Sequence, residues 1–136
     1  MYKKKLINSI NCNKIASIKY QINIMSHEYI RFLEVLKGLS AKESISIDPE
    51  AKLLLDEIAI KHFKETPLTV SDLMALNHIA SPATIHRKLD SLLQANLVEL
   101  KFEGENRRTK FIGITKVGDR YLSSLSKAMI KAVKLA

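Results

Sequence analysis

The stretch that decides the fold is residues 81–115, which read SPATIHRKLDSLLQANLVELKFEGENRRTKFIGIT. Ser81 followed by Pro82 is typical of a helix start, because serine caps free N–H groups and proline is tolerated in the first turn. From Val98 onward apolar and polar residues alternate, which is typical of a half-buried strand. The alternation breaks at EGENRR and resumes to Ile114. The stretch therefore predicts one helix followed by a β-hairpin.

Other helix starts surround this stretch. Asp48-Pro49 pairs a capping residue with a first-turn proline, and Thr69-Val70-Ser71-Asp72 resembles a capping box with aspartate at its last position. A helix, a short turn and a second helix are typical of a helix-turn-helix. The expected helices are 27–39, 49–63, a short one after 69, 82–94 and 116–134. The expected strands are 98–102 and 110–114, joined by a loop at 103–109.

These elements predict a mainly α fold with a small β-hairpin wing. The fold class is a winged helix-turn-helix with additional N- and C-terminal helices. We divide the chain into a basic N-terminal extension, an N-terminal helix with its link, the winged helix-turn-helix domain and a C-terminal helix; these are residues 1–26, 27–47, 48–115 and 116–136. The extension is open to three interpretations: a basic arm, a helix swapped between the copies of a dimer, or a mobile segment that need not belong to the natural protein.

Helical spacing of apolar residues predicts which faces are buried. In the first helix these residues are Tyr29, Phe32, Leu33, Leu36 and Leu39. In the second they are Leu53, Leu54, Leu55, Ile58, Ala59 and Ile60, extending to about Phe63. In the last they are Tyr121, Leu122, Leu125, Met129 and Val133.

The composition points to an acidic partner. The formal net charge is +8, which favours nucleic acid or anionic lipid. The basic excess lies at the two ends of the chain, because residues 67–115 carry six basic and five acidic side chains. No run approaches the roughly 20 apolar residues of a membrane helix, and Cys12 is the single cysteine. We therefore expect a cytoplasmic protein with no membrane segment and no intrachain disulfide.

The expected helix 82–94 has two different faces. Steps of about 100° per residue place Ile85, Leu89, Leu92 and Leu93 toward the core. The opposite face carries small and polar residues, with Lys88 at its edge; we expect DNA contacts from Ser81, Ala83, Thr84, Arg87, Lys88 and Ser91. Arg87 can pair with a guanine edge or a phosphate. A solvated surface helix is the alternative interpretation.

The tip of the expected hairpin is the second candidate contact. Asn106, Arg107, Arg108 and Lys110 lie at or near it. Arginine suits the narrow minor groove of A·T-rich DNA, where the negative potential is enhanced. A solubilising loop is the alternative, and Glu103 and Glu105 oppose DNA binding unless they are paired.

The segments LTVSDLMAL, SPATIHRKLDSLLQANLVE and ENRRTKFIGITKVGDRYL together resemble the MarR-type winged-helix regulators. The resemblance covers about residues 48–121. It implies a transcriptional regulator that binds a pseudo-palindromic site in double-stranded DNA as a homodimer, paired through the terminal helices. It also implies a small-molecule effector, whose identity the residues do not indicate. The apolar faces of those terminal helices are equally compatible with an intrachain core.

The sequence carries no sign of an enzyme. The four glycines are scattered, which excludes a glycine-rich phosphate loop, and the four histidines fall on separate segments. We therefore expect no catalytic residues, no cofactor and no metal. Two alternatives to a regulator remain, a winged-helix protein-interaction module and a plasmid- or phage-type replication or partition protein.

Overall fold

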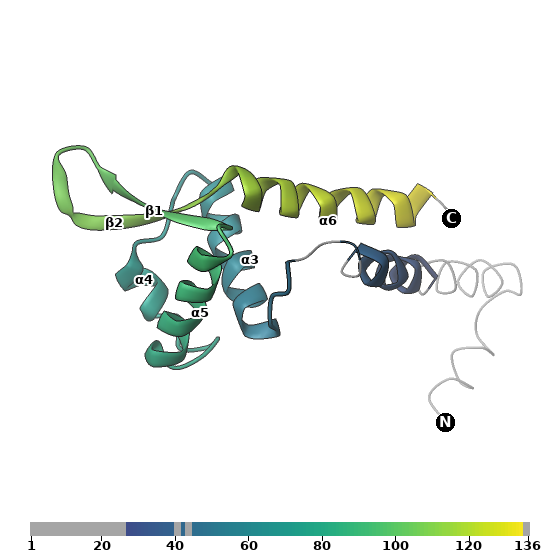
Figure 1. Cartoon of the computed structure of the whole chain (residues 1–136), viewed down its shortest axis with the longest axis horizontal. Coiled ribbons are helices and arrows are strands. Elements are labelled where there is room, and N and C mark those ends of the chain that lie inside the picture. The colour runs from purple at the N-terminus through teal and green to yellow at the C-terminus, as the bar shows by residue number, and fades with distance from the viewer. Residues whose placement is uncertain (1–26, 40–41, 43–44, 135–136) are drawn as a thin grey trace, which may run out of the picture. The chain divides into compact units, whose positions relative to one another are not determined.

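The computed structural model describes residues 27–39, 42 and 45–134 (Figure 1). Residues 27–39 are helical. The remaining elements are α3 (Pro49–Phe63), α4 (Val70–Met74), α5 (Pro82–Gln94), β1 (Val98–Glu103), β2 (Asn106–Ile114) and α6 (Lys116–Lys134). This order confirms the predicted winged helix-turn-helix with additional terminal helices. The predicted basic extension, residues 1–26, lies outside the described residues.

The chain forms two compact units. One comprises residues 43–124 and contains α3, α4, α5, the hairpin and the start of α6. The other combines residues 1–42 with residues 125–136, and therefore joins the helical segment 27–39 to the C-terminal part of α6. In the described part of the chain, no helix is both long and apolar enough to span a membrane.

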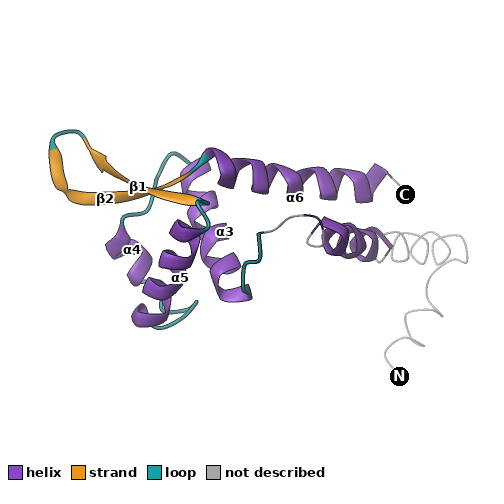
Figure 2. Ribbon diagram, viewed as in Figure 1, coloured by secondary structure: helices purple, strands orange, loops and turns teal. Residues whose placement is uncertain are grey.

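The core of the 43–124 unit is aliphatic. Helix α3 packs against α5 and β2, and the hairpin also contacts α4 and α5 (Figure 2). The completely buried large side chains are Leu54, Leu55, Ile58, Leu73, Ile85, Leu92, Leu97, Val98 and Ile112. These residues form one cluster, so the two helices of the helix-turn-helix and the wing share a single core.

The predicted buried faces were partly wrong. On α3, the side chains of Leu53, Ile60 and Phe63 are exposed. They follow one another at helical spacing along a second stripe, whereas α3 buries only the stripe that faces α5 and β2. Prediction from apolar residues alone could not separate the two stripes.

The outer ends of the terminal helices also differ from prediction. Tyr29, Met129 and Val133 are exposed, while Ala128 and Ala132 are buried. Because the two alanines are four residues apart, they lie on one face of α6. The buried stripe of α6 therefore continues through small residues, and the larger side chains beside it remain outside.

The predicted helix caps are confirmed. Asp48 Oδ1 accepts the N–H of Ala51 at 3.0 Å, and Ser81 Oγ accepts the N–H of Thr84 at 3.3 Å. At α4 the capping box is complete, because Thr69 Oγ1 accepts the N–H of Asp72 at 3.1 Å while Asp72 Oδ2 accepts the N–H of Thr69 at 3.0 Å. These bonds satisfy N–H groups that have no partner within the helix.

The hairpin is longer than predicted. Strands β1 and β2 pair antiparallel from Val98 opposite Ile114 to Phe102 opposite Lys110, and then Glu103 pairs with Asn106. The expected loop 103–109 was therefore wrong in its bounds, because only residues 104 and 105 form the turn. Residues 107–109 are an irregularity within β2, since the register jumps across them. A bulge of this kind was not visible in the alternation of residue types.

A third chain segment extends the sheet. Leu68 O accepts the N–H of Ile112 at 2.9 Å, and Thr69 forms an isolated antiparallel bridge with Phe111. The start of α4 is thereby attached to β2. The wing and the first helix of the helix-turn-helix are consequently fixed to each other by backbone hydrogen bonds.

The joint between α5, β1 and α6 centres on Leu97. Helix α5 ends with Asn96 at a φ of 56°, and the N–H groups of Leu97 and Asn96 bond to the carbonyls of Leu92 and Leu93 at 3.1 and 3.0 Å. This pattern is a Schellman motif. Leu97 O then accepts the N–H of Thr115 at 3.1 Å.

Gly118 completes this joint. Thr115 Oγ1 accepts the N–H of Gly118 at 3.0 Å, which caps α6. A Cβ atom at position 118 would lie 2.1 Å from Leu97 O. The backbone of α6 therefore approaches the end of α5 so closely that only glycine fits.

We predict that Gly118→Ala destabilises the protein by about 1–3 kcal/mol, because the added methyl group collides with backbone that cannot move aside cheaply. Denaturant unfolding measures this change. Gly113→Ala is the control, because its Cβ would lie 3.7 Å from Glu99 Cγ, an ordinary contact. The control should change stability by less than about 1 kcal/mol; equal losses in both variants would contradict the close approach.

We also predict an acid-dependent loss of the α4 cap. The hydroxyl of Thr69, followed by its N–H, holds the pKa of Asp72 below the ordinary value of 3.8. Because the folded pKa is the lower one, this stabilisation is present above pH 3.8 and is lost as the pH falls through the folded pKa. Asp72→Ala should thus be less stable than the wild type at neutral pH, with a difference that shrinks in acid.

Denaturant unfolding at neutral pH and at about pH 3 tests this prediction. Ser71→Ala is the control, because it changes an exposed neighbour that does not titrate. Its difference from the wild type should be the same at both pH values. An Asp72→Ala difference that does not shrink in acid would contradict the proposed role of the carboxylate.

Candidate nucleic-acid interface

The outward face of α5 is built from the residues predicted for it. Ala83, Arg87 and Ser91 are exposed, and Thr84 is half-buried. On the opposite side Ile85, Leu89 and Leu92 are buried in the core. Because the apolar side anchors the helix, the polar side is presented to the surroundings.

Hydrogen bonds connect the polar residues of this face. Ser81 Oγ donates to Thr84 Oγ1 at 3.0 Å, and Arg87 Nη2 donates to the same Thr84 oxygen at 3.4 Å. Ser91 Oγ donates to the carbonyl of Arg87 at 3.0 Å. The guanidinium of Arg87 is therefore held along the helix surface above the first turn, with most of its donors still available.

Lys88 differs from its neighbour Arg87. Its Nζ lies 2.9 Å from Asp48 Oδ1 and 3.3 Å from Glu50 Oε2, both at the start of α3. The side chain is only 23% exposed. Hydrogen bonding to Asp48 raises the pKa of Lys88, and the N–H of Ala51 followed by Lys88 lowers the pKa of Asp48. The structure therefore places Lys88 against α3, away from the outward face.

The wing carries the second set of predicted residues. Arg107 and Arg108 are exposed and lie in the irregular part of β2, and Lys110 is exposed at its end. Asn106 begins β2, and its side chain lies outside the described part of the structure. Glu103 and Glu105 are exposed beside them, so the tip has mixed charge.

Phe102 is a surface residue that sequence reasoning missed. It continues the inward alternation of Val98 and Leu100, yet it is 46% exposed because the hairpin extends beyond the core. The Nζ of Lys110, its cross-strand partner, lies 5.6 Å from the centre of the phenyl ring. An exposed ring under a cation is a surface on which a base or sugar can pack.

A notch of about 310 Å³ lies where α4, α5 and the wing meet. Of the predicted site residues, the structure brings Arg108 and Lys110 to this notch, beside His86 and Asp90 of α5. His86 Nδ1 lies 3.3 Å from Asp90 Oδ2. Ser81, Ala83 and Arg87 do not line the notch, so the outward face of α5 and the wing tip form neighbouring areas rather than one pocket.

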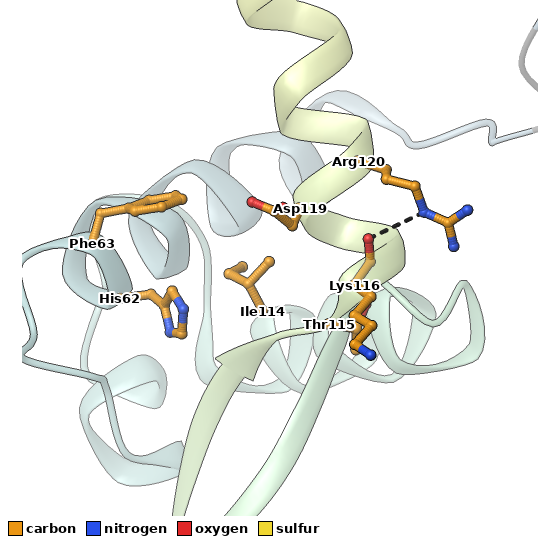
Figure 3. Close-up of a pocket in the computed structure, with 7 residues that line it drawn as sticks. All are labelled: His62, Phe63, Ile114, Thr115, Lys116, Asp119 and Arg120. Carbon is orange, nitrogen blue, oxygen red and sulfur yellow. Dashed lines mark hydrogen bonds between the residues drawn. The ribbon is translucent and has the colours of Figure 1, made fainter.

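A second, open depression of about 520 Å³ lies between the end of α3 and the start of α6 (Figure 3). His62, Phe63 and Asp119 line it from the two helices, and Arg120 Nε donates to Lys116 O at 3.4 Å at its edge. Its volume is within the usual range for small ligands, but much of its lining is charged.

The described part of the chain holds no group of three or more histidine, cysteine or acidic side chains placed to bind a metal. Carboxylates that lie close to other polar groups instead cap helices or form ion pairs. Lys52 pairs with Asp56 along α3, and Lys101 Nζ lies 2.7 Å from Glu99 Oε1. The chemistry of the surface is therefore that of charge and hydrogen bonding.

The sequence matches no known protein family, and no curated protein matches it. Solved structures do match over most of the chain. MepR of Staphylococcus aureus bound to ethidium bromide has 17% identity and a TM-score of 0.63, covering 94% of this chain and 81% of that one. The transcriptional regulator Tm0710 of Thermotoga maritima has 17% identity and a TM-score of 0.57, covering 90% and 77%.

A mutant of the same Staphylococcus aureus MepR, bound to an oligodeoxyribonucleotide, matches with 18% identity and a TM-score of 0.60, covering 87% of this chain and 80% of that one. At such identities the likeness concerns the fold. It agrees with the helix-turn-helix, the hairpin wing and the flanking helices described above. The chain therefore has the winged-helix fold of the MarR-type regulators.

Proposed function

We propose that the protein is a sequence-specific regulator that binds double-stranded DNA and acts on transcription. The observation that carries the proposal is the outward face of α5, which presents Ala83 and Arg87 opposite a completely buried side. The hairpin wing, which brings Arg108 and Lys110 to the notch, lies next to this helix. MepR, which shares the fold, has been solved in complex with DNA.

In the proposed mode α5 enters the major groove. Small residues at its start let the backbone approach the base edges, and Arg87 contacts a guanine or a phosphate. Ser81 and the N–H of Ala83 face a phosphate, since Pro82 has no N–H and Thr84 donates its own to Ser81 Oγ. The wing reaches the adjacent minor groove through Arg107 or Arg108, with Asn106 and Lys110 beside them.

The protein is proposed to act as a homodimer paired through the terminal helices. Support comes from the unit that contains these helices, in which large apolar side chains are exposed: Tyr29, Ile30, Met129, Ile130 and Val133. Large apolar side chains that remain exposed in one unit are available to be buried against a second copy. Two copies would place two α5 helices on a pseudo-palindromic operator.

A protein-interaction module is the second candidate function. It is favoured by the charge of residues 67–115, which carry six basic and five acidic side chains. Two of the six bases, Lys88 and Lys101, are engaged with carboxylates. Under this hypothesis the face of α5 would contact a protein rather than DNA.

Selection of bound fragments from random-sequence DNA, repeated at two salt concentrations, separates these two functions. Enrichment of an inverted repeat would support a dimeric regulator and yield its operator. Binding without enrichment, lost steeply as salt rises, would indicate a phosphate-driven binder. Absence of binding at low salt would overturn the proposal in favour of the protein-interaction module.

We predict that Arg87→Ala weakens binding to the selected site by about 1–3 kcal/mol and relaxes the preference at one base pair. The reason is the loss of a bidentate contact to a base. Titration of labelled selected and scrambled duplexes measures both effects. Arg120→Ala, an exposed arginine on α6, is the matched control and should leave affinity nearly unchanged. An equal loss on every sequence would reassign Arg87 to a phosphate.

We predict that Arg108→Ala weakens sites with A·T-rich flanks more than sites with G·C-rich flanks, because a narrow minor groove attracts arginine most strongly. Affinities for two duplexes that share the central site and differ in flanks measure this preference. Lys134→Ala, on the last turn of α6, is the control and should keep the wild-type preference between the two duplexes. Unchanged binding of both duplexes by Arg108→Ala would remove the wing from the proposed interface.

A further inference from the structure

Lys88 forms a clamp between two helices that are distant in the sequence. Its ammonium group is shared by Asp48 and Glu50, at 2.9 and 3.3 Å. The same Asp48 oxygen also accepts the N–H of Ala51, so it caps α3 while it holds α5. We call Lys88, Asp48 and Glu50 the α3–α5 clamp.

The clamp differs in kind from the contacts around it. The buried cluster to which α3 and α5 both contribute is apolar and includes Leu54, Ile58, Ile85 and Leu92. Apolar burial is non-directional and opposes sliding or rotation of two helices only through shape. The attraction of a lysine ammonium for a carboxylate depends on distance, so the two ion pairs favour the register of α5 on α3 in which Lys88 reaches both Asp48 and Glu50.

Resting on the proposed function, we propose that Lys88 is a positioning residue that sets the orientation of the recognition helix α5, and that it does not contact DNA phosphates itself. Three observations support this assignment. The side chain is mostly covered, two carboxylates compensate its charge, and both partners belong to another helix. Two of the three donors of the Lys88 ammonium are engaged by carboxylates, so at most one remains for a phosphate while both ion pairs persist.

The raised pKa of Lys88 and the lowered pKa of Asp48 agree with the geometry. The charged groups on the neighbouring elements agree with this assignment. Glu50 of α3 lies beside the ammonium group of Lys88, whereas Asp90 of α5 lies beside His86. Arg87, one residue away, donates a hydrogen bond to the hydroxyl of Thr84 rather than to a carboxylate, and its side chain is exposed. Arg87 and Lys88, which are adjacent on α5, are therefore assigned different roles.

The first test compares Lys88→Met with Lys110→Met, a matched loss of one lysine from the wing. Affinities of the full chain for the selected duplex and for a scrambled duplex are measured over a range of salt concentrations. Log K falls as log salt rises, and the loss of one phosphate contact makes this slope less steep by about 0.9. We expect that decrease for Lys110→Met and an unchanged slope for Lys88→Met.

For Lys88→Met we expect a different defect. The ratio of selected to scrambled affinity should fall about tenfold, which corresponds to about 1.4 kcal/mol, because a misaligned α5 loses base contacts and keeps phosphate contacts. Lys88→Arg, which retains the charge, should restore most of the ratio. A reduced salt slope in Lys88→Met, or a ratio equal to that of the wild type, would overturn the inference.

The second test leaves α5 untouched. Asp48→Asn combined with Glu50→Gln removes both partners of Lys88, while asparagine still caps α3. We expect the same fall in the affinity ratio. If Lys88 were a phosphate contact, releasing it would instead raise the affinity for DNA and make log K fall more steeply with log salt. Asp56→Asn combined with Glu57→Gln, the same charge change elsewhere on α3, is the control and should leave the ratio unchanged.

The outcomes for the wild type and the variants separate the two proposals. A wild-type protein without preference for any duplex would overturn both the proposed function and this inference. A wild type that discriminates, alongside clamp variants that discriminate equally well, would overturn only the role of Lys88. Circular dichroism at the assay temperature confirms that each variant is folded before its ratio is compared.

Discussion

The arrangement of the winged helix depends on the backbone of one residue, Leu97. Its N–H closes the end of α5, its carbonyl receives the N–H of Thr115 just before α6, and its side chain is completely buried. The absence of a side chain at Gly118 lets α6 pass beside that carbonyl. Helices α5 and α6 and strand β1 are therefore joined at Leu97. The direction of each is set by hydrogen bonds rather than by apolar contact alone.

The candidate interface follows from this fixed framework. Helix α5 is held at its end by the joint at Leu97, along its length by the core, and at one edge by Lys88. What remains free is a narrow polar face around Arg87. The net charge of this surface therefore contributes little to attracting a partner, because several lysines and carboxylates neutralise each other. Recognition by such a surface depends on where a few cations are placed.

Local signals allowed most of the elements to be predicted from the sequence. Caps at Asp48, Thr69, Ser81 and Thr115 involve residues three apart, so their chemistry is visible in the sequence itself. The exposed stripe of α3, the bulge at 107–109 and the partners of Lys88 depend on residues that only folding brings together. Phe102 was missed for the same reason, because alternation predicts the face of a strand but not where the core ends.

The bulge in β2 has a consequence for how this surface can vary. The regular pairing between Val98–Phe102 and Lys110–Ile114 ends before residues 107–109, and the core lies on the other side of that boundary. Changes in the length or residues of the tip should therefore leave the folded body intact, as is usual for exposed loop tips. Under the proposed function, the preference for flanking sequence would then diverge among related chains, while the helix proposed to read the centre of the site stays constant.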